Sequence, residues 1–318
     1  MYTSDVIISV AALLTGLALL AWAADQLVLG ASRLAIALRV SAVLIGALVI
    51  GVGTSAPEIL ISALAAAEGS VSIAAGNIVG SNIANVALVI GVAALIAPLR
   101  VSSHTLRRQA PLSAFAVIAF AIALQGGLTL LSGVLLLLAV PLVVGWIVRS
   151  ADRERAEVEA EAQAVASSDT RLRGEVIRTV LALLGLAAGA QLVVTGAERI
   201  TLEAGLDEGF VGLTLVAVGT SLPELVTAIQ ATRRRQPDLI VGNVLGSNIF
   251  NSLLAGGLIA VIAPGRLADP ALTGLAAIAM VATALVTWLF LATDRQLTRR
   301  EGTLLLGGYL ALLAVLAR

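Results

Sequence analysis

Cysteine and lysine are absent from this chain of 318 residues, and histidine occurs only once, as His104. Without cysteine the chain can form neither disulfides nor thiolate metal sites. With one histidine it has no imidazole cluster for zinc or copper, which prefer nitrogen and sulfur ligands. Charged residues make up only 13% of the chain, whereas soluble domains contain about 25%. The composition therefore excludes a soluble globular protein.

Hydrophobic residues make up 59% of the chain, and the mean hydropathy is +1.02. Apolar segments long enough to cross a bilayer recur along its whole length, and the first has neither a basic start nor a clear cleavage site, so we expect it to be retained. The pattern predicts an all-α membrane protein in a lipid bilayer, with ten transmembrane helices at residues 5–25, 41–67, 71–97, 107–125, 128–148, 176–197, 209–231, 238–262, 271–292 and 302–317.

The basic residues predict the orientation in the membrane. All 20 are arginine, and with the N-terminus outside, 17 of them fall on cytoplasmic loops and ends. Only Arg199, Arg266 and Arg318 then lie outside. Because basic residues favour the cytoplasmic side, we expect a multi-pass protein of the cell (inner) membrane with both termini outside. The arginines are spread over separate loops without interleaved aromatics, so no nucleic-acid partner is expected.

One heptapeptide occurs twice. "VGTSAPE" at Val52–Glu58 returns as "VGTSLPE" at Val218–Glu224, and the same offset pairs "GNIVGSNIAN" at Gly76–Asn85 with "GNVLGSNIFN" at Gly242–Asn251. Each copy belongs to five predicted helices, and an odd number makes the second copy enter from the opposite side, as in the inverted repeats of secondary transporters. We therefore predict a first five-helix repeat at 1–148, a cytoplasmic linker at 149–175 and a second, inverted repeat at 176–318.

The heptapeptide places helix-breaking and charged residues inside apolar segments. Pro57 and Pro223 lack an N–H and free the carbonyls of Gly53 and Gly219. A charge at the centre of a membrane helix costs about 2.5–3.5 kcal/mol. Glu58 and Glu224, in matched positions, therefore imply a compensating cation.

The second segment of each copy supplies further oxygen ligands. Ser81 with Asn85, and Ser247 with Asn251, are four residues apart and share a helical face. Carboxylate, hydroxyl, amide and carbonyl oxygens suit hard cations such as Ca2+ or Na+.

The paired "GTSAPE" and "GTSLPE", each followed by "GNxxGSNIxN", resemble the alpha-repeats of the sodium/calcium exchanger family of the cation/calcium exchanger superfamily, in its prokaryotic form. The resemblance implies the exchanger fold of ten helices in an inverted 5+5 arrangement, with ion sites between helices 2, 3, 7 and 8. It implies an antiporter that exchanges Ca2+ for Na+ by alternating access, not an enzyme, and without a cofactor. The ligands it implies are Glu58 and Glu224, with Thr54, Ser55, Thr220, Ser221, Ser81, Asn85, Ser247 and Asn251 and the backbone carbonyls of Gly51 and Ala217.

Three alternatives stay open. The two glutamates could bind two protons in exchange for one Ca2+. A channel would need a continuous pore, which suits broken helices less well than occlusion. An intramembrane hydrolase would need a base, and His104 is expected on a loop.

Many relatives carry an aspartate where Asn251 stands, so potassium dependence is not expected. The expected oligomeric state is a monomer.

Other acidic residues are assigned to the surface. Asp25 aligns with Gln191 of the second repeat, which favours a helix-end or interfacial carboxylate over a third ion ligand. Glu198, Glu203, Asp207 and Glu208 cluster on the predicted outer face, as an entrance for cations or as a solvated loop. Helices 1 and 6 are expected to slide and open either side.

Overall fold

The computed structural model describes residues 2–101, 108–151, 172–203, 217–265, 267 and 272–316, and these are almost entirely helical. In chain order the elements are α1 (Tyr2–Leu38), α2 (Ala42–Ile45), η1 (Gly46–Ile50), α3 (Gly51–Thr54), α4 (Ala56–Ala67), α5 (Val71–Ile83), η2 (Ala84–Val89), α6 (Ile90–Ile96), β1 (Leu99–Arg100), α7 (Ala110–Gly126), α8 (Leu130–Ala151), α10 (Leu172–Glu203), α12 (Ala217–Thr220), α13 (Leu222–Arg233), α14 (Pro237–Phe250), η5 (Asn251–Ala255), α15 (Gly256–Ile262), η6 (Leu272–Ala276), α16 (Ala277–Asp294), β2 (Gln296–Leu297) and α17 (Arg299–Leu316).

The described part of every predicted apolar segment lies on a helical run. Within the described residues, six helices are long and apolar enough to cross a membrane, and a bent pair, 42–54 with 56–67, would make a seventh. Most of the predicted linker, 152–171, and the first part of the predicted helix 209–231 lie outside the described residues.

The predicted ends of two helices were wrong. α1 continues past residue 25 to Leu38, and α10 runs from Leu172 to Glu203. Arg33 and Arg199, predicted on loops, are therefore inside these helices. Many of the residues that extend them are leucine, alanine, arginine, glutamine or glutamate, which are good helix formers. In these extensions the hydropathy falls while the helix propensity stays high, so a prediction from hydropathy ends the helix too early.

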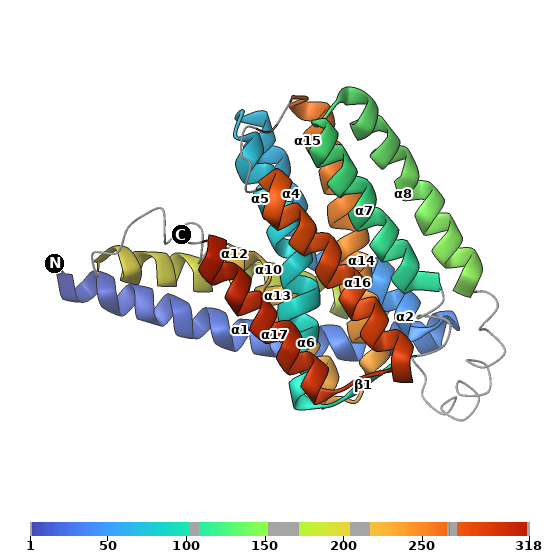
Figure 1. The fold of residues 1–318 in the computed structure, drawn as a ribbon. Coiled ribbons are helices and arrows are strands. Elements are labelled where there is room, and N and C mark those ends of the chain that lie inside the picture. Colours follow the sequence, from blue (N-terminus) through green and yellow to red (C-terminus); the bar gives the residue numbers. More distant parts are fainter. Residues whose placement is uncertain are drawn as a thin grey trace.

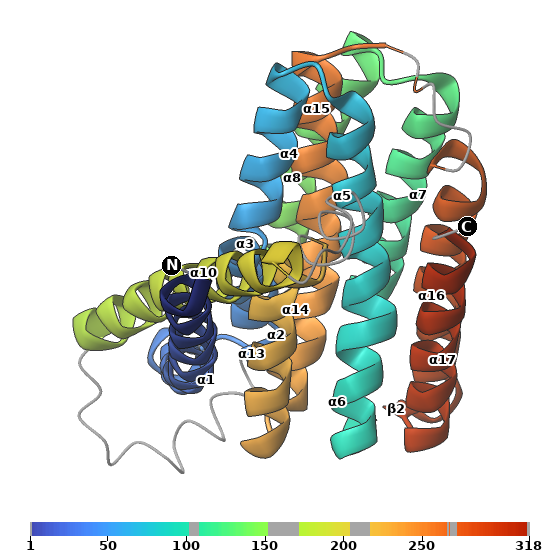
Figure 2. The same cartoon turned by 90° about the vertical axis from the view of Figure 1, so that its left-hand side faces the viewer.

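Helices α1 and α10 lie side by side and cross the other long helices at a steep angle (Figure 1). In the second view α1 is seen nearly end-on, with α10 beside it (Figure 2). Glycines let the two backbones approach: a Cβ at Gly16 would lie 2.8 Å from the Gly189 carbonyl oxygen. α1 and α10 therefore form one closely packed unit, which we call the crossing pair.

Two contacts in the crossing pair are related by the sequence offset of the repeat. A Cβ at Gly30 would lie 2.7 Å from the Thr179 hydroxyl, and a Cβ at Gly196 would lie 2.9 Å from the Leu13 nitrogen. Position 30 corresponds to 196 and position 13 to 179, so each contact maps onto the other when the halves of the chain are exchanged.

Charges hold the crossing pair together near the start of α10. The buried Glu175 carboxylate pairs with Arg33 of α1 at 3.0 Å and with Arg178 of its own helix at 3.0 Å. Arg178 also donates to the Gln26 side chain at 2.7 Å. A nearly buried carboxylate with two guanidinium partners makes strong, charge-assisted contacts that stabilise this end of the pair.

The remaining helices form a bundle drawn from both halves of the chain. α14 packs on η1, α2, α3 and α7, while α15 packs on α8 and α17 on α6. Backbone pairings join the halves at opposite ends of the bundle (Figure 1). At one end β1 pairs antiparallel with β2, and at the other Gly265 donates to the Leu128 carbonyl at 2.7 Å.

Candidate cation site

Both copies of the heptapeptide form a helix that breaks at its serine. Ser55 has φ −84° and ψ 0°, and Ser221 has φ −86° and ψ 1°. Pro57 and Pro223 each lie in the first turn of the helix that follows, where a backbone N–H would have no helical partner. The two prolines therefore begin new helices, α4 and α13, and the first break bends the chain by 42°.

The two glutamates lie in the first turns of the helices that follow these breaks. Glu58 is 1% exposed and Glu224 0% exposed, each in the first turn of its helix. The first turn favours a negative charge because its N–H groups point towards it. The carboxylates are close enough to repel each other. The Oε2 atom of each glutamate is buried and has no hydrogen-bond partner in the described part of the chain. Each glutamate therefore has an oxygen available for a cation.

Hydroxyl groups surround the carboxylates. Ser55 of the first copy donates to Glu224 of the second at 3.4 Å, and the buried Thr54 also interacts with that carboxylate. Ser221 is buried, and its hydroxyl has no partner among the described residues, while Thr220 is buried beside it. Four predicted hydroxyl ligands are thus placed at the two helix breaks.

Gly51 allows the second half to approach the first. A Cβ there would lie 3.1 Å from the Asn243 carbonyl oxygen and from the Ser247 nitrogen. The Gly51 carbonyl accepts from the Ser247 hydroxyl at 3.3 Å and from the Ser55 N–H at 3.2 Å. The corresponding residue, Ala217, begins α12, which packs on α5. The Gly51 carbonyl already has two protein donors in this state.

The predicted amide ligands lie on π-helical turns, η2 and η5. Asn85 is buried and donates to the Asn248 side chain at 3.1 Å. Asn251 is fully buried, and both polar atoms of its amide lack partners in the described residues. Ser81 is also buried, one turn before Asn85. π-Helical turns are rare and often mark functional sites.

Sequence reasoning missed four other asparagines of the same motifs. Asn77 donates to the Glu58 carbonyl at 3.2 Å and to Ser62 at 2.9 Å. The side-chain oxygen of its counterpart Asn243 instead accepts a hydrogen bond from the Thr54 hydroxyl of the other half at 3.2 Å. Asn82 and Asn248 are also related by the offset, and the Asn248 side-chain amide donates to the Asn82 backbone carbonyl at 3.4 Å. The signal was present, because each asparagine recurs at the offset that revealed the glutamates.

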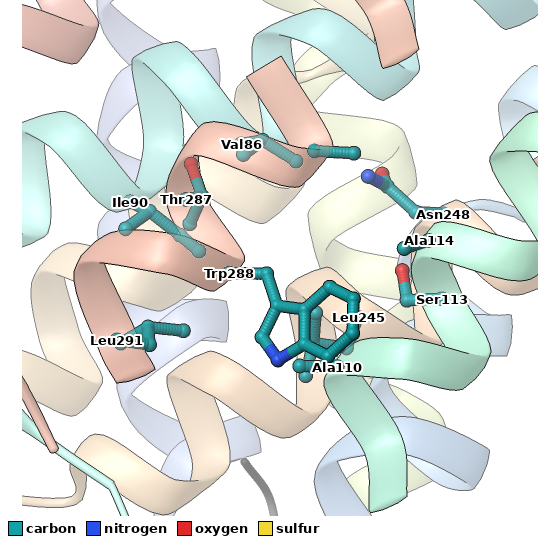
Figure 3. A pocket seen from close by; sticks show the side chains of 11 residues that line it. Val86, Ile90, Ala110, Ser113, Ala114, Leu245, Asn248, Thr287, Trp288 and Leu291 are labelled. Carbon is teal, nitrogen blue, oxygen red and sulfur yellow. The ribbon is translucent and has the colours of Figure 1, made fainter. Parts of the chain in front are cut away.

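A small, mostly apolar pocket lies next to this site, between η2, α6, α7, α14 and α16 (Figure 3). Asn248 lines it on the side of the site, and Trp288, Ser113 and Thr287 line it elsewhere. Neither glutamate borders it. The pocket therefore adjoins the polar cluster but does not include the carboxylates.

The donor set determines which cations fit. In the described part of the chain, no cluster of three or more acidic, histidine or cysteine residues could hold a metal. Two carboxylates with hydroxyl, amide and carbonyl oxygens suit hard cations, which accept neutral oxygen ligands readily.

Asp25, the other acidic residue weighed as an ion ligand, does not join this cluster. Asp25 lies inside α1 rather than at its end, and it pairs with Arg234 at 2.7 Å. His104, Asp207 and Glu208 lie outside the described residues, as do the side chains of Glu198 and Glu203.

Known proteins match nearly the whole chain. The model of the family described as sodium/calcium exchanger protein matches residues 8–148 and 175–318. The putative antiporter CaxA of Alkalimonas amylolytica is 38% identical over 93% of this chain and 95% of its own length. The sodium/calcium exchanger MaX1 of Methanosarcina acetivorans is 31% identical over 96% and 97%.

The fold matches as well. A solved structure of the sodium-calcium exchanger NCX_Mj, soaked with 2.5 mM Na+ and 10 mM Sr2+, agrees with a TM-score of 0.85 at 32% identity, over 97% of this chain and 99% of that one. These relatives are membrane exchangers and not enzymes, which confirms the resemblance drawn from the paired motifs. The chain belongs to the sodium/calcium exchanger family.

Proposed function

We propose that this protein is a secondary active antiporter that exchanges Ca2+ for Na+ across the cell membrane by alternating access. The observation that carries the proposal is the meeting of two buried glutamates, Glu58 and Glu224, one from each copy of the motif. Two buried carboxylates that repel each other need positive charge between them. Transported cations supply it.

We further propose ten membrane-spanning helices in two inverted repeats, 1–148 and 176–318, joined by a cytoplasmic linker at 149–175. The matched contacts Gly30–Thr179 and Gly196–Leu13 support this arrangement, because an inverted repeat exchanges them. The orientation with both termini outside is supported by Arg100, Arg295, Arg299 and Arg300, which are exposed around β1 and β2 at one end of the bundle.

The proposed ligands are the twelve residues expected from the sequence. Their oxygens come from both broken helices, from the end of α5 with η2, and from the end of α14 with η5: Glu58, Glu224, Thr54, Ser55, Thr220, Ser221, Ser81, Asn85, Ser247 and Asn251, with the carbonyls of Gly51 and Ala217. Gly51 would have to release one of its two present donors to bind an ion.

Coupling follows from the charge of the site. The two carboxylates neutralise one Ca2+ or two Na+, so the ions compete for the same oxygens. Asn251 is neutral, so a third Na+ would leave a positive site and make exchange electrogenic, and no potassium requirement is expected. An empty site leaves two carboxylates unneutralised, which disfavours movement without ions.

The crossing pair covers the site. α10 packs on α3 and on α12, the helices just before the two breaks. A Cβ at Gly53 would lie 2.5 Å from the Leu183 side chain, and one at Gly219 would lie 2.1 Å from Val194. Sliding of α1 and α10 across these helices would therefore open the site to one side or the other.

A Ca2+/H+ antiporter is the second candidate. The unpartnered Oε2 atoms of Glu58 and Glu224 could each take a proton, and two protons balance one Ca2+. Measuring 45Ca2+ uptake into proteoliposomes separates the two. We expect uptake driven by internal Na+ at equal pH on both sides. Uptake that instead needs a pH gradient, and ignores Na+, would favour the proton mechanism.

A further inference from the structure

We propose that the ion pair between Asp25 of α1 and Arg234, just after α13, stabilises one access state of the exchanger, and that the opposite state has no equivalent ion pair. The inference rests on the proposed alternating access of an inverted repeat. It assigns these two residues a role in setting which side of the membrane the empty protein faces.

The contact is specific. Two guanidinium nitrogens of Arg234 reach the same Asp25 oxygen, Nη2 at 2.7 Å and Nε at 2.8 Å. One turn earlier on each helix, Gln230 donates to the Ala21 carbonyl at 3.4 Å. α1 packs against α13. The ion pair therefore joins one member of the crossing pair to the helix that carries Glu224.

The repeat-related position is built differently. In the alignment of the two repeats, Asp25 corresponds to Gln191 of α10, and Arg234 corresponds to Glu68, which follows α4. α10 does not pack against α4 as α1 packs against α13 in the described residues. Gln191 donates to Thr195 of its own helix at 3.2 Å, and Glu68 is exposed. From this difference in packing we assign the structure to the state closed on the side of Arg234.

Exchange of the access state would reverse these roles. In an inverted repeat the opposite state brings α10 against α4, as α1 now lies against α13. Gln191 would then face Glu68, and an amide would replace the guanidinium–carboxylate pair. An amide–carboxylate hydrogen bond is weaker than a charge-assisted pair with two charged groups. The two access states are thus unequal by one ion pair.

The size of the bias follows from exposure. The side chains of Asp25 and Arg234 are 36% and 37% exposed, so solvent screens their attraction. Exposed pairs of this kind shift an equilibrium by about two- to five-fold. With Arg234 on the cytoplasmic side, the empty protein would favour the state open to the outside. That state waits for external Na+, which suits Ca2+ efflux.

The absence of cysteine allows a direct test. In an otherwise unchanged chain, Ala21→Cys with Gln230→Cys reports the state closed at Arg234. The repeat-related pair Ala187→Cys with Leu64→Cys reports the opposite state. We expect faster disulfide cross-linking of the first pair without ions. Asp25→Asn should shift the ratio of the two rates about two- to five-fold towards the second pair. The Arg234→Gln variant should do the same.

Two further variants keep the test independent of folding defects. The charge exchange Asp25→Arg with Arg234→Asp should restore the ratio, and Gln191→Arg, which offers Glu68 a partner, should shift it towards the second pair. Unchanged ratios in Asp25→Asn and in Gln191→Arg would overturn the inference. Failure of Na+-driven uptake in the parent chain would instead count against the proposed function, because cross-linking needs no transport.

Discussion

The Ser55 hydroxyl, at the break of the first motif helix, lies 3.4 Å from the Glu224 carboxylate that begins the second motif helix. This contact joins residues that are 169 positions apart in the sequence, and it brings the two copies of the motif together at one site. The two glutamates, rather than either helix alone, therefore define the site.

The first prediction concerns the carboxylates. Glu58→Gln and Glu224→Gln should each abolish exchange, because one remaining carboxylate cannot balance Ca2+. Both variants should fold, because removal of one buried charge relieves the repulsion between the pair. The measurement is 45Ca2+ uptake into Na+-loaded proteoliposomes. Glu68→Gln, which changes an exposed carboxylate, is the control and should transport normally. Full activity in either buried variant would remove that glutamate from the site.

The second prediction separates the two serines. Ser55→Ala removes a donor to Glu224 and a proposed ion ligand, whereas Ser221→Ala removes a hydroxyl that has no protein partner among the described residues. A hydrogen bond contributes about 0.5–1.5 kcal/mol to stability. Ser55→Ala should therefore lower both the melting temperature and the Ca2+ affinity, and Ser221→Ala only the affinity. Calorimetric titration with thermal unfolding tests this, and equal loss of stability in both would contradict it.

The third prediction uses a matched pair of glycines. A Cβ at Gly246 would lie 2.4 Å from the Ala47 carbonyl oxygen, while one at the repeat-related Gly80 would meet nothing within 4 Å. Gly246→Ala should destabilise the protein by about 1–3 kcal/mol through overpacking. Gly80→Ala should be neutral or slightly stabilising, since alanine favours helices by about 0.5–1 kcal/mol. Thermal unfolding in detergent measures both, and similar effects would refute the close approach of α14 to η1.

The fourth prediction concerns ion binding to the resting protein. Ca2+ should raise the melting temperature, because a ligand of the folded state alone stabilises it by about 2.7 kcal/mol at 100 times its Kd. Na+ should also stabilise, and saturating Na+ should reduce the further shift caused by Ca2+, since both ions need the same carboxylates. Glu58→Gln is the control and should lose the Ca2+ shift. Additive shifts from the two ions would show separate sites.

The fifth prediction concerns the neutral asparagine of η5. Asn251→Asp adds a third carboxylate at a fully buried position whose amide has no partner in the described residues. The added charge should increase the number of Na+ ions exchanged per Ca2+ or the affinity for Na+. Asn85→Asp, at the repeat-related position, should act similarly. The current carried per Ca2+ in proteoliposomes measures the change, and identical currents and Na+ affinities would place both residues outside the site.

Sequence alone located the parts of the fold that repeat. The matched heptapeptides predicted the broken helices and both buried glutamates, because a proline and a carboxylate in an apolar segment have few structural explanations. The ends of α1 and α10 were missed because hydropathy records where lipid ends, not where a helix ends. Arg33 shows this directly, since it pairs with Glu175 between two helices that continue beyond the apolar segment.

The π-helical turns and the roles of the second-motif asparagines could not be predicted. η2 and η5 have ordinary helical sequences, and both pack on helices of the other half of the chain, η2 on α17 and η5 on α7 and α8. Asn77 and Asn243 occupy equivalent positions but bind different partners, because Ser62 is replaced by Ala228 in the second copy. Equivalence in sequence therefore did not guarantee equivalence in hydrogen bonding.

The pairing of β1 with β2, and of Gly265 with Leu128 at the other end, has a consequence for how affinity depends on the side of the membrane. These two links oppose separation of the halves of the bundle, so we expect the proposed ligands of the two halves to stay in place relative to each other during the proposed transport cycle. An ion arriving from the cytoplasm would then meet the same coordination shell as one arriving from outside. Any difference between the inner and outer dissociation constants would come from how often each entrance is open.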